Sequence, residues 1–366
     1  MPPGVEFVSH TEFSTSGDPG GGSALTAEKK IIKTMKIGIS FPLTTPLGRV
    51  TVFIITPLRI TMRRPSPKES LDHRLRSLAA DIDSLRSRKM PHDVPSKWEK
   101  FDDVAIIPNK SFRDEFWEEI PSDVLWREVA IAIGVQRLYR KGEVDGPKRK
   151  PEIELLTGSS RGSWVIRKEN GIRYGYDITN CMWSAGNVNE RRRMGEVAKP
   201  GETVLDLFAG IGYYTLPILK SSSSINLIAC EWNQASIESL HWNLSENGLE
   251  HQCTVIEGDC TETVPKLSLQ VDRAVLGLLP DSTFAIPTAI GAFGPEGGML
   301  HLHALSNSKE YDSQSEEIKR KILDSSGEFT IGSLDVVRVK SYAPKWDHVV
   351  YDIVLDGREA SMTQGD

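Results

Sequence analysis

Residues 203–216, TVLDLFAGIGYYTL, are the stretch that most limits how this chain can fold. The apolar run at 204–208, interrupted by Asp206, predicts a buried parallel strand that carries an acid near its carboxyl end. A turn around Gly210 follows, and a helical pattern begins at Tyr213. Small residues let a ligand approach the backbone, and the following helix presents its positive amino-terminal end. This order of elements predicts a nucleotide site at the carboxyl edge of an open α/β sheet.

The composition of the glycine turn also limits the kind of ligand. The dinucleotide fingerprint needs a third glycine, but Thr215 stands in its place, and the turn has no P-loop lysine. A pyrophosphate cofactor is therefore disfavoured, and a dehydrogenase with it. S-adenosylmethionine, which carries adenosine without phosphates, is a better match. The alternative is a tight turn that binds nothing.

Two later strands are also expected to end in acids. Residues 225–230 predict a strand followed by Glu231, and an acid about 20 residues after the first strand suits ribose hydroxyls. Residues 253–256 predict a third strand followed by Asp259, which suits the adenine amino group. Each acid alone is more often a helix cap or a solvated loop residue. Together with Asp206, they line up along one sheet edge and favour a ligand site.

The 366 residues predict a leader and two folded domains. Residues 1–97 form the leader, which is rich in Gly, Ser and Pro at its start and is expected to be disordered there. Within it, residues 35–60 are either a strand pair or unstructured, and residues 70–86 predict an amphipathic helix. Residues 98–180 are expected to form a small α+β accessory domain. Residues 181–358 are expected to form the cofactor-binding catalytic domain.

Periodicity and turn signals predict the elements of both domains. In the accessory domain Asn170-Gly171 predicts a hairpin turn, and a helix is expected to begin with Ser122 or Asp123 as its cap. The other accessory strands are expected at 105–108, 153–157, 164–167 and 172–178. The catalytic domain continues with strands at 273–279 and 298–305, helices at 282–292 and 316–323, and a closing strand pair at 336–340 and 348–355. The alternation predicts an α/β fold with a Rossmann-like, doubly wound sheet of the class I methyltransferase type.

Composition excludes several other classes of protein. The four cysteines form no C-x-x-C pair, so neither a zinc site nor a disulfide framework is expected, and the default location is the cytoplasm. We find no signal peptide pattern and no apolar run long enough to cross a bilayer. The net charge of −6 argues against a broad nucleic-acid-coating surface but allows a local basic patch. The oligomeric state is not specified by these features, and a monomer is favoured.

Several stretches between about residue 98 and residue 355 together resemble one known family. They are LWREVAIAIGVQRL, NGIRYGYDITNCMWSAGNVNER, DLFAGIGYYTLP, ACEWN, DRAVLGLLP and VKSYAPKWDHVV. The glycine turn alone is common among methyltransferases, but its combination with the other stretches is specific. The chain resembles the tRNA wybutosine-synthesising protein 2 family of aminocarboxypropyl transferases, which are relatives of the tRNA guanine-37 nitrogen-1 methyltransferases.

The resemblance implies a set of contacts to S-adenosylmethionine. The implied cofactor residues are Ser184, Arg191, Glu231, Asp259 and Cys260, and the strand and glycine turn add Asp206 and Gly210 as candidates. Arg191 is a hypothesised clamp for the methionine carboxylate, because a guanidinium pairs with a carboxylate bidentately. Asp206 either contacts the methionine amine or only braces the glycine turn. The family often has Asn at the place of Cys260, so the backbone of Cys260 could serve where the side chain differs.

The resemblance also implies the reaction. It is transfer of the 3-amino-3-carboxypropyl group to carbon 7 of 4-demethylwyosine at position 37 of tRNA(Phe), with the anticodon loop as partner. Gly277, Leu279, Pro280 and Tyr342 are the implied substrate residues. The guanine methyltransferases carry Asn-Leu-Pro at this place, whereas Leu278 here is apolar and suits a carbon nucleophile. The alternatives are a tRNA guanine-37 methyltransferase and a non-catalytic RNA-binding protein.

Contact with RNA requires positive charge near the site. The basic candidates are Arg137, Arg140, Lys141, residues 148–150 and 191–193, Lys340 and Lys345. Trp183, Tyr342 and Trp346 are candidates for stacking on a base. His301 and His303 face one side of an expected strand, but no third metal ligand is evident, so we expect a structural pair.

Overall fold

The computed structural model describes residues 31–45, 48–62, 65–145, 150–158, 162–325 and 329–357. The chain divides into two compact units, Met1–Asp81 and Ile82–Asp366. The boundary therefore lies between Asp81 and Ile82, whereas the sequence suggested a change after residue 97. The disorder expected at the start of the leader falls on residues outside the described ranges.

The first unit contains a strand pair and a helix. Strand β1 (Ile31–Thr45) pairs antiparallel with β2 (Gly48–Met62), which answers the alternative left open for residues 35–60. Helix α1 (Pro67–Ala80) begins with a capping box between Ser66 and Glu69. The prediction that this helix continues to Arg86 is wrong, because α1 ends at Ala80 and residues 82–88 form separate turns.

The second unit begins with a small four-stranded sheet and the helix α2 (Ser122–Ile133). Its strands, in the order β3-β4-β5-β6, are β3 (Glu99–Phe101), β4 (Val104–Ile107), β5 (Arg137–Asp145) and β6 (Lys150–Thr157). Strand β5 was not predicted, because its arginines interrupt the apolar pattern. Pro121 occupies the N-cap position of α2 and no side chain caps the helix, so the expected cap at Ser122 or Asp123 is wrong.

A hairpin of β7 (Trp164–Glu169) and β8 (Ile172–Asp177) follows the small sheet. Asn170 and Gly171 both have positive φ, 49° and 76°, as the predicted turn requires. Two asparagines attach this hairpin to helix α5 (Gln234–Glu246). Asn243 of the helix accepts from the N–H of Gly175. Asn247, the C-cap residue, accepts from the N–H of Arg173 and donates to its carbonyl.

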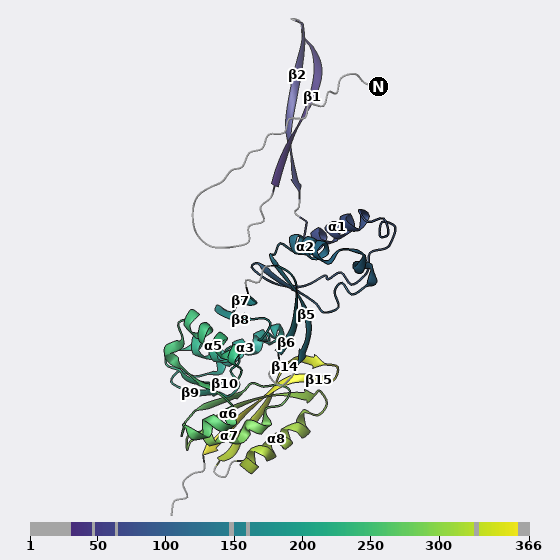
Figure 1. Ribbon diagram of the computed structural model, residues 1–366. Coiled ribbons are helices and arrows are strands. Elements are labelled where there is room, and N and C mark those ends of the chain that lie inside the picture. Colours follow the sequence, from purple (N-terminus) through teal and green to yellow (C-terminus); the bar gives the residue numbers. More distant parts are fainter. Residues whose placement is uncertain are drawn as a thin grey trace, which may run out of the picture. The chain divides into compact units, whose positions relative to one another are not determined.

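A seven-stranded sheet forms the centre of the second unit, as predicted (Figure 1). Its order is β11-β10-β9-β12-β13-β15-β14, with the first five strands parallel and the last two antiparallel. The strands are β9 (Thr203–Asp206), β10 (Asn226–Glu231), β11 (Cys253–Glu257), β12 (Arg273–Leu276), β13 (Gly297–Asn307), β14 (Phe329–Ala343) and β15 (Trp346–Gly357).

Helices cover both faces of this sheet, so it has a core on each side. They are α3 (Val188–Val197), α4 (Thr215–Ser221), α6 (Cys260–Thr263), α7 (Ile286–Ala292) and α8 (Tyr311–Ser325), together with α5. Val204 points to the core under α4 and α5, and its neighbour Leu205 points to the core under α7 and α8. The helix expected from Ser282 starts as a 3-10 turn, Thr283–Ala285, and Pro287 fits because it lies in the first turn of α7.

The core under α4 and α5 also contains residues of the small sheet and the hairpin. Phe101 of β3 packs edge-on against Tyr176 of β8, and Tyr176 stacks on Trp183 just before α3. Residues 98–180 and 181–358, which the sequence suggested as two domains, therefore share one hydrophobic core.

Candidate cofactor and substrate pocket

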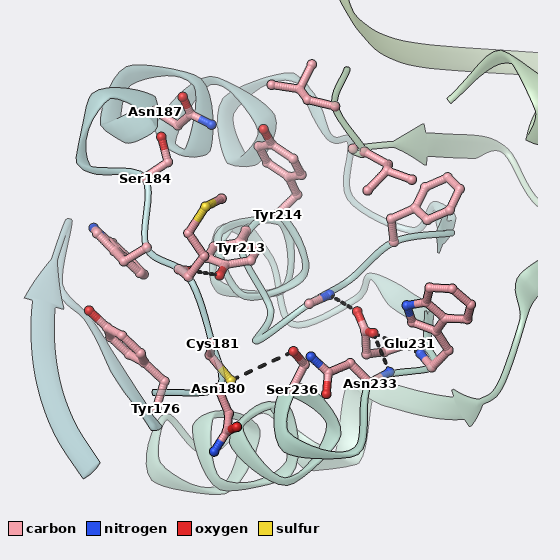
Figure 2. Close-up of a pocket in the computed structure, with 18 of the residues that line it drawn as sticks. Tyr176, Asn180, Cys181, Ser184, Asn187, Tyr213, Tyr214, Glu231, Asn233 and Ser236 are labelled. Atoms are coloured by element: carbon pink, nitrogen blue, oxygen red, sulfur yellow. Dashed lines mark hydrogen bonds between the residues drawn. The ribbon is translucent and has the colours of Figure 1, made fainter. Parts of the chain in front are cut away.

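A pocket of about 1000 Å³ opens at the carboxyl ends of the parallel strands. Small-molecule sites commonly measure about 300–1,000 Å³, so this pocket lies at the upper end of that range. It is lined by every cofactor and substrate residue predicted from the sequence except Asp206. Figure 2 shows Ser184, Tyr213, Tyr214 and Glu231 around its interior.

The glycine turn and Glu231 form one wall of the pocket. The Glu231 carboxylate accepts from the backbone N–H groups of Gly210 at 2.7 Å, Trp232 at 2.8 Å and Asn233 at 2.7 Å (Figure 2). A Cβ at Gly210, whose φ is 57°, would lie 2.5 Å from the Tyr213 ring, so only glycine fits there. Burial raises the pKa of Glu231, and the three N–H bonds oppose that rise. The result is a carboxylate of fixed orientation facing the pocket.

Asp259 and Cys260 lie at the far end of the same edge. The Asp259 carboxylate caps helix α6 by accepting from the N–H of Thr261 at 2.8 Å. Burial raises the pKa of the Cys260 thiol to about 12, so it is uncharged at neutral pH and offers the pocket a small, weakly polar surface.

Asp206 does not line the pocket; it is fully buried beneath the glycine turn. It accepts from the Thr215 hydroxyl at 2.8 Å and from the N–H of Phe208 at 3.3 Å. Burial raises its pKa to about 6, although the bond from Thr215 lowers it. Of the two roles left open for Asp206, this geometry supports bracing of the turn.

Arg191 faces the pocket, but its guanidinium already binds a carboxylate. It pairs bidentately with Glu169, donates to the carbonyl of Ser184 at 3.0 Å, and lies 4.3 Å from the centre of the Trp183 ring. The Arg191 side chain is 1% exposed and that of Glu169 13% exposed. We expected Arg191 to bind the methionine carboxylate. In this structure its guanidinium instead binds Glu169 and holds the segment that carries Ser184.

An apolar lip forms the opposite wall, after β12. Gly277, Leu278, Leu279 and Pro280 all line the pocket. A Cβ at Gly277 would lie 2.8 Å from the Tyr214 ring, so glycine allows close packing here. Phe284 is 56% exposed, packs against Phe208 and extends the apolar surface.

Other residues line the pocket that sequence reasoning did not place at the cofactor site. Glu99, Ile106 and Ile153 come from the small sheet, together with Lys141, which was considered only for contact with RNA. Only the shared core brings these strands beside the cofactor edge, and no local pattern indicates it. Lys340 of β14 also lines the pocket, and its ammonium donates to the Ser184 hydroxyl at 2.9 Å.

Most basic residues proposed to contact RNA are paired with acids. Arg137 binds Asp103, Arg140 binds Glu154, and Arg193 binds both Glu190 and Asp352. Their charges serve the fold more than a surface for RNA.

The remaining candidates are divided between exposed positions and positions outside the described residues. Arg192 is 59% exposed and lies 3.6 Å from the similarly exposed Glu196 carboxylate, and Tyr342 and Trp346 are 51% and 46% exposed. Lys345 lies at an exposed turn between β14 and β15, whereas Lys148 and Arg149 lie outside the described residues.

His301 and His303 lie on the same side of β13, and both are buried. His301 bonds Asp352 and Arg273, and His303 bonds His348 at 3.0 Å. Within the described ranges no group of three or more His, Cys, Asp or Glu residues could hold a metal ion. A search of the same ranges found no helix with the length and apolar character needed to cross a membrane.

Comparison with known proteins identifies similar sequences for most of the second unit. Residues 165–327 match the TRM5/TYW2 methyltransferase domain, and residues 82–162 match the TYW2 N-terminal domain. The tRNA wybutosine-synthesizing protein 2/3/4 of Arabidopsis thaliana is 38% identical over 76% of this chain, which spans only 28% of that longer protein. The tRNA wybutosine-synthesizing protein 2 homolog of Rattus norvegicus is 32% identical over 79% of this chain and 77% of its own length. The crystal structure of P. horikoshii TYW2 in complex with MeSAdo superposes with a TM-score of 0.61, at 28% identity, over 76% of this chain and 99% of that one.

Proposed function

Because the chain belongs to the tRNA wybutosine-synthesizing protein 2 family, we propose that it is an S-adenosylmethionine-dependent aminocarboxypropyl transferase acting on tRNA. The acceptor is carbon 7 of 4-demethylwyosine at position 37 of tRNA(Phe), presented by the anticodon loop. The acceptor's identity rests on the family alone. A cytoplasmic location stays a prediction.

The residues of the pocket are compatible with this cofactor. Glu231 offers an oriented carboxylate of the kind that accepts from ribose hydroxyls, and Gly210 leaves space where any side chain would collide with Tyr213. Asp259 and Cys260 lie farther along the same edge, where adenine would reach. Relatives support the same choice, since one of the solved structures is TYW2 in complex with MeSAdo.

The observation that carries the choice of reaction is the apolar lip from Gly277 to Pro280. An acceptor nitrogen bearing a proton needs a polar partner, and Leu278 and Leu279 supply none from their side chains. A carbon nucleophile needs no such partner, so this wall suits it.

When bound, S-adenosylmethionine supplies a sulfonium whose attached carbons are all open to attack. The arm would pass from sulfur to carbon 7 of the acceptor, with methylthioadenosine as the leaving group and the C7 proton released to solvent. The role of the chain is to position the acceptor against the apolar lip, to keep water out with Phe284 and Leu279, and to orient the arm.

Two labelled cofactors test this proposal. tRNA containing 4-demethylwyosine is incubated with S-adenosylmethionine labelled either in the methyl group or in the aminocarboxypropyl group. We expect only the second label to enter tRNA, with release of methylthioadenosine. tRNA with unmodified guanosine at position 37 is the control and should accept neither label. Methyl label in either tRNA would refute the proposal and favour a guanine-37 methyltransferase.

A further inference from the structure

An exposed aromatic side chain, that of Phe284, lines the pocket beside the apolar lip. Among the described side chains, the exposed Phe, Tyr and Trp residues are Trp232, Phe284, Tyr342 and Trp346, and all of them except Trp346 line the pocket. Phe284 is the most exposed of this group, at 56%, and it alone in the group carries no polar atom on its ring. Tyrosine and tryptophan can hydrogen-bond to water at such a position, whereas exposure of a phenylalanine ring only costs free energy. An open phenylalanine ring at the pocket therefore indicates a surface that a ligand covers.

The turn that carries Phe284 holds the ring outward. The Asp281 carboxylate accepts from the N–H of Thr283 at 2.9 Å and from its hydroxyl at 3.0 Å, which fixes the start of the 3-10 turn. Ser282 and Ala285 are both fully buried. Residues three apart lie on the same side of a 3-10 turn, so this pair faces the core and residue 284 faces away from it. The exposure of the ring is thus built into the turn.

Phe208 supports the Phe284 ring but does not cover it. The two ring centroids are 5.7 Å apart with an angle of 69° between the ring planes, which is an edge-to-face contact. Because more than half of Phe284 is exposed, at least one face of its ring remains open. Phe208, Phe284 and residues 278–280 all line the same pocket, so the open face continues the apolar surface of the lip.

An open aromatic face beside an apolar wall suits a flat, unpaired base. Bases that leave the stack of a single-stranded loop are commonly held by stacking on aromatic side chains. The acceptor that the family implies, 4-demethylwyosine, is tricyclic and offers a wider face than guanine does. We propose that the acceptor base stacks on the open face of the Phe284 ring, and that this contact favours the tricyclic base over unmodified guanine.

This inference deepens the proposed function and rests on it for the identity of the acceptor. The sequence suggested other residues for stacking on a base, and Phe284 was not among them. One of those candidates, Trp183, is only 7% exposed and already stacks on Tyr176, so it offers no open face. Phe284 offers such a face, and its place beside the lip gives the acceptor a defined orientation there.

Binding of tRNA to the full chain tests the inference. Methylthioadenosine occupies the cofactor site throughout, so no group is transferred. Fluorescence anisotropy gives the Kd of two tRNAs, one with 4-demethylwyosine at position 37 and one with unmodified guanosine there. For Phe284→Ala we expect the first tRNA to bind about 5- to 150-fold more weakly, as for loss of one base–aromatic stack, and the second to change less.

Three further variants serve as controls. Phe284→Tyr keeps the ring and should bind both tRNAs as the wild type does. Phe284→Leu keeps an apolar side chain without an aromatic face, and it should resemble Phe284→Ala. Leu323→Ala removes a similarly exposed apolar side chain from α8, outside the pocket lining, and should change neither Kd.

Several outcomes would overturn the inference. Equal weakening of both tRNAs by Phe284→Ala would mean that the ring contacts RNA away from the acceptor base. Full binding by Phe284→Leu would mean that the lip needs apolar surface and no stack. Weaker binding of methylthioadenosine itself, measured by calorimetry, would assign the ring to the cofactor. Unchanged binding of both tRNAs would refute the stack and leave the proposed function standing, because the labelling experiment uses the wild-type protein alone.

Discussion

Replacement of Arg191 by Met tests whether this arginine binds the cofactor or supports the pocket. The change keeps an apolar stem over Trp183 but removes a guanidinium that makes two bonds to Glu169 and one to the Ser184 carbonyl. Glu169, 13% exposed, is then left with its charge nearly buried and unpaired. Breaking a buried pair in this way costs about 3–5 kcal/mol, so we expect a loss of that order in the free energy of unfolding.

A double-mutant cycle with Glu169→Gln separates the pair from the rest of the site. Glu169→Gln alone leaves Arg191 partly unpaired, and the double variant removes both charges. The double variant should therefore be more stable than the sum of the single losses implies, with a coupling of about 2–3 kcal/mol, near the upper end for residues in contact. Equilibrium unfolding in urea, followed by intrinsic fluorescence, measures the three variants against wild type.

Cofactor binding by the same variants completes the test. If Arg191 acts through the Ser184 segment, Arg191→Met weakens S-adenosylmethionine and methylthioadenosine together, because both occupy a distorted pocket. A coupling near zero, with loss confined to ligands that carry the carboxylate, would refute this reasoning and restore the direct clamp expected from the sequence.

Three further predictions follow from single contacts. Glu231→Gln places an amide donor near the N–H of Gly210, so S-adenosylmethionine should bind about 10- to 100-fold more weakly by calorimetry, and unchanged affinity would contradict the assigned role. The pKa of Asp206 is about 6 in the folded protein and 3.8 in the unfolded chain, so the folded protein loses stability as the pH rises from about 4 to 6. Asp206→Asn cannot titrate, so its free energy of unfolding in urea should rise relative to that of the wild type by up to about 3 kcal/mol across this pH range. If the two proteins show the same dependence of stability on pH, the prediction is refuted. Gly175→Ala puts a Cβ 2.5 Å from the Trp242 ring and should cost about 1–3 kcal/mol, whereas Gly291→Ala, which meets nothing within 4 Å, should be neutral or stabilising, and equal effects would contradict the packing argument.

The cofactor edge could be read from the sequence because its signals are local. Strands β9, β10 and β11 are short apolar runs that each end near an acid. Gly210 follows the first of them, at the place where the chain must turn. Parallel strands bring their carboxyl ends to one edge, so Gly210, Glu231 and Asp259 line one pocket although they are far apart in sequence, whereas Asp206 is buried beneath the turn.

The contacts that complete the pocket depend on distant pairings with no local pattern. Arg191 finds Glu169 across a hairpin, and Lys340 reaches Ser184 from 156 residues away. Strand β5 was missed because its arginines look like surface charge, although Arg137 and Arg140 are buried against acids. A single sequence carries the types of these residues but not their partners.

The joint between the hairpin and helix α5 limits how this protein can be recombined. Asn243 and Asn247 fix the backbone of β8 to α5, while Arg167 on the neighbouring strand reaches Glu99 of the small sheet. A chimera that borrows residues 82–162 from a relative would keep the asparagine contacts but replace the partner of Arg167 and the ring that packs on Tyr176. Donor sequences with an acid and an aromatic residue at those two places are therefore the ones from which a working hybrid enzyme should be built.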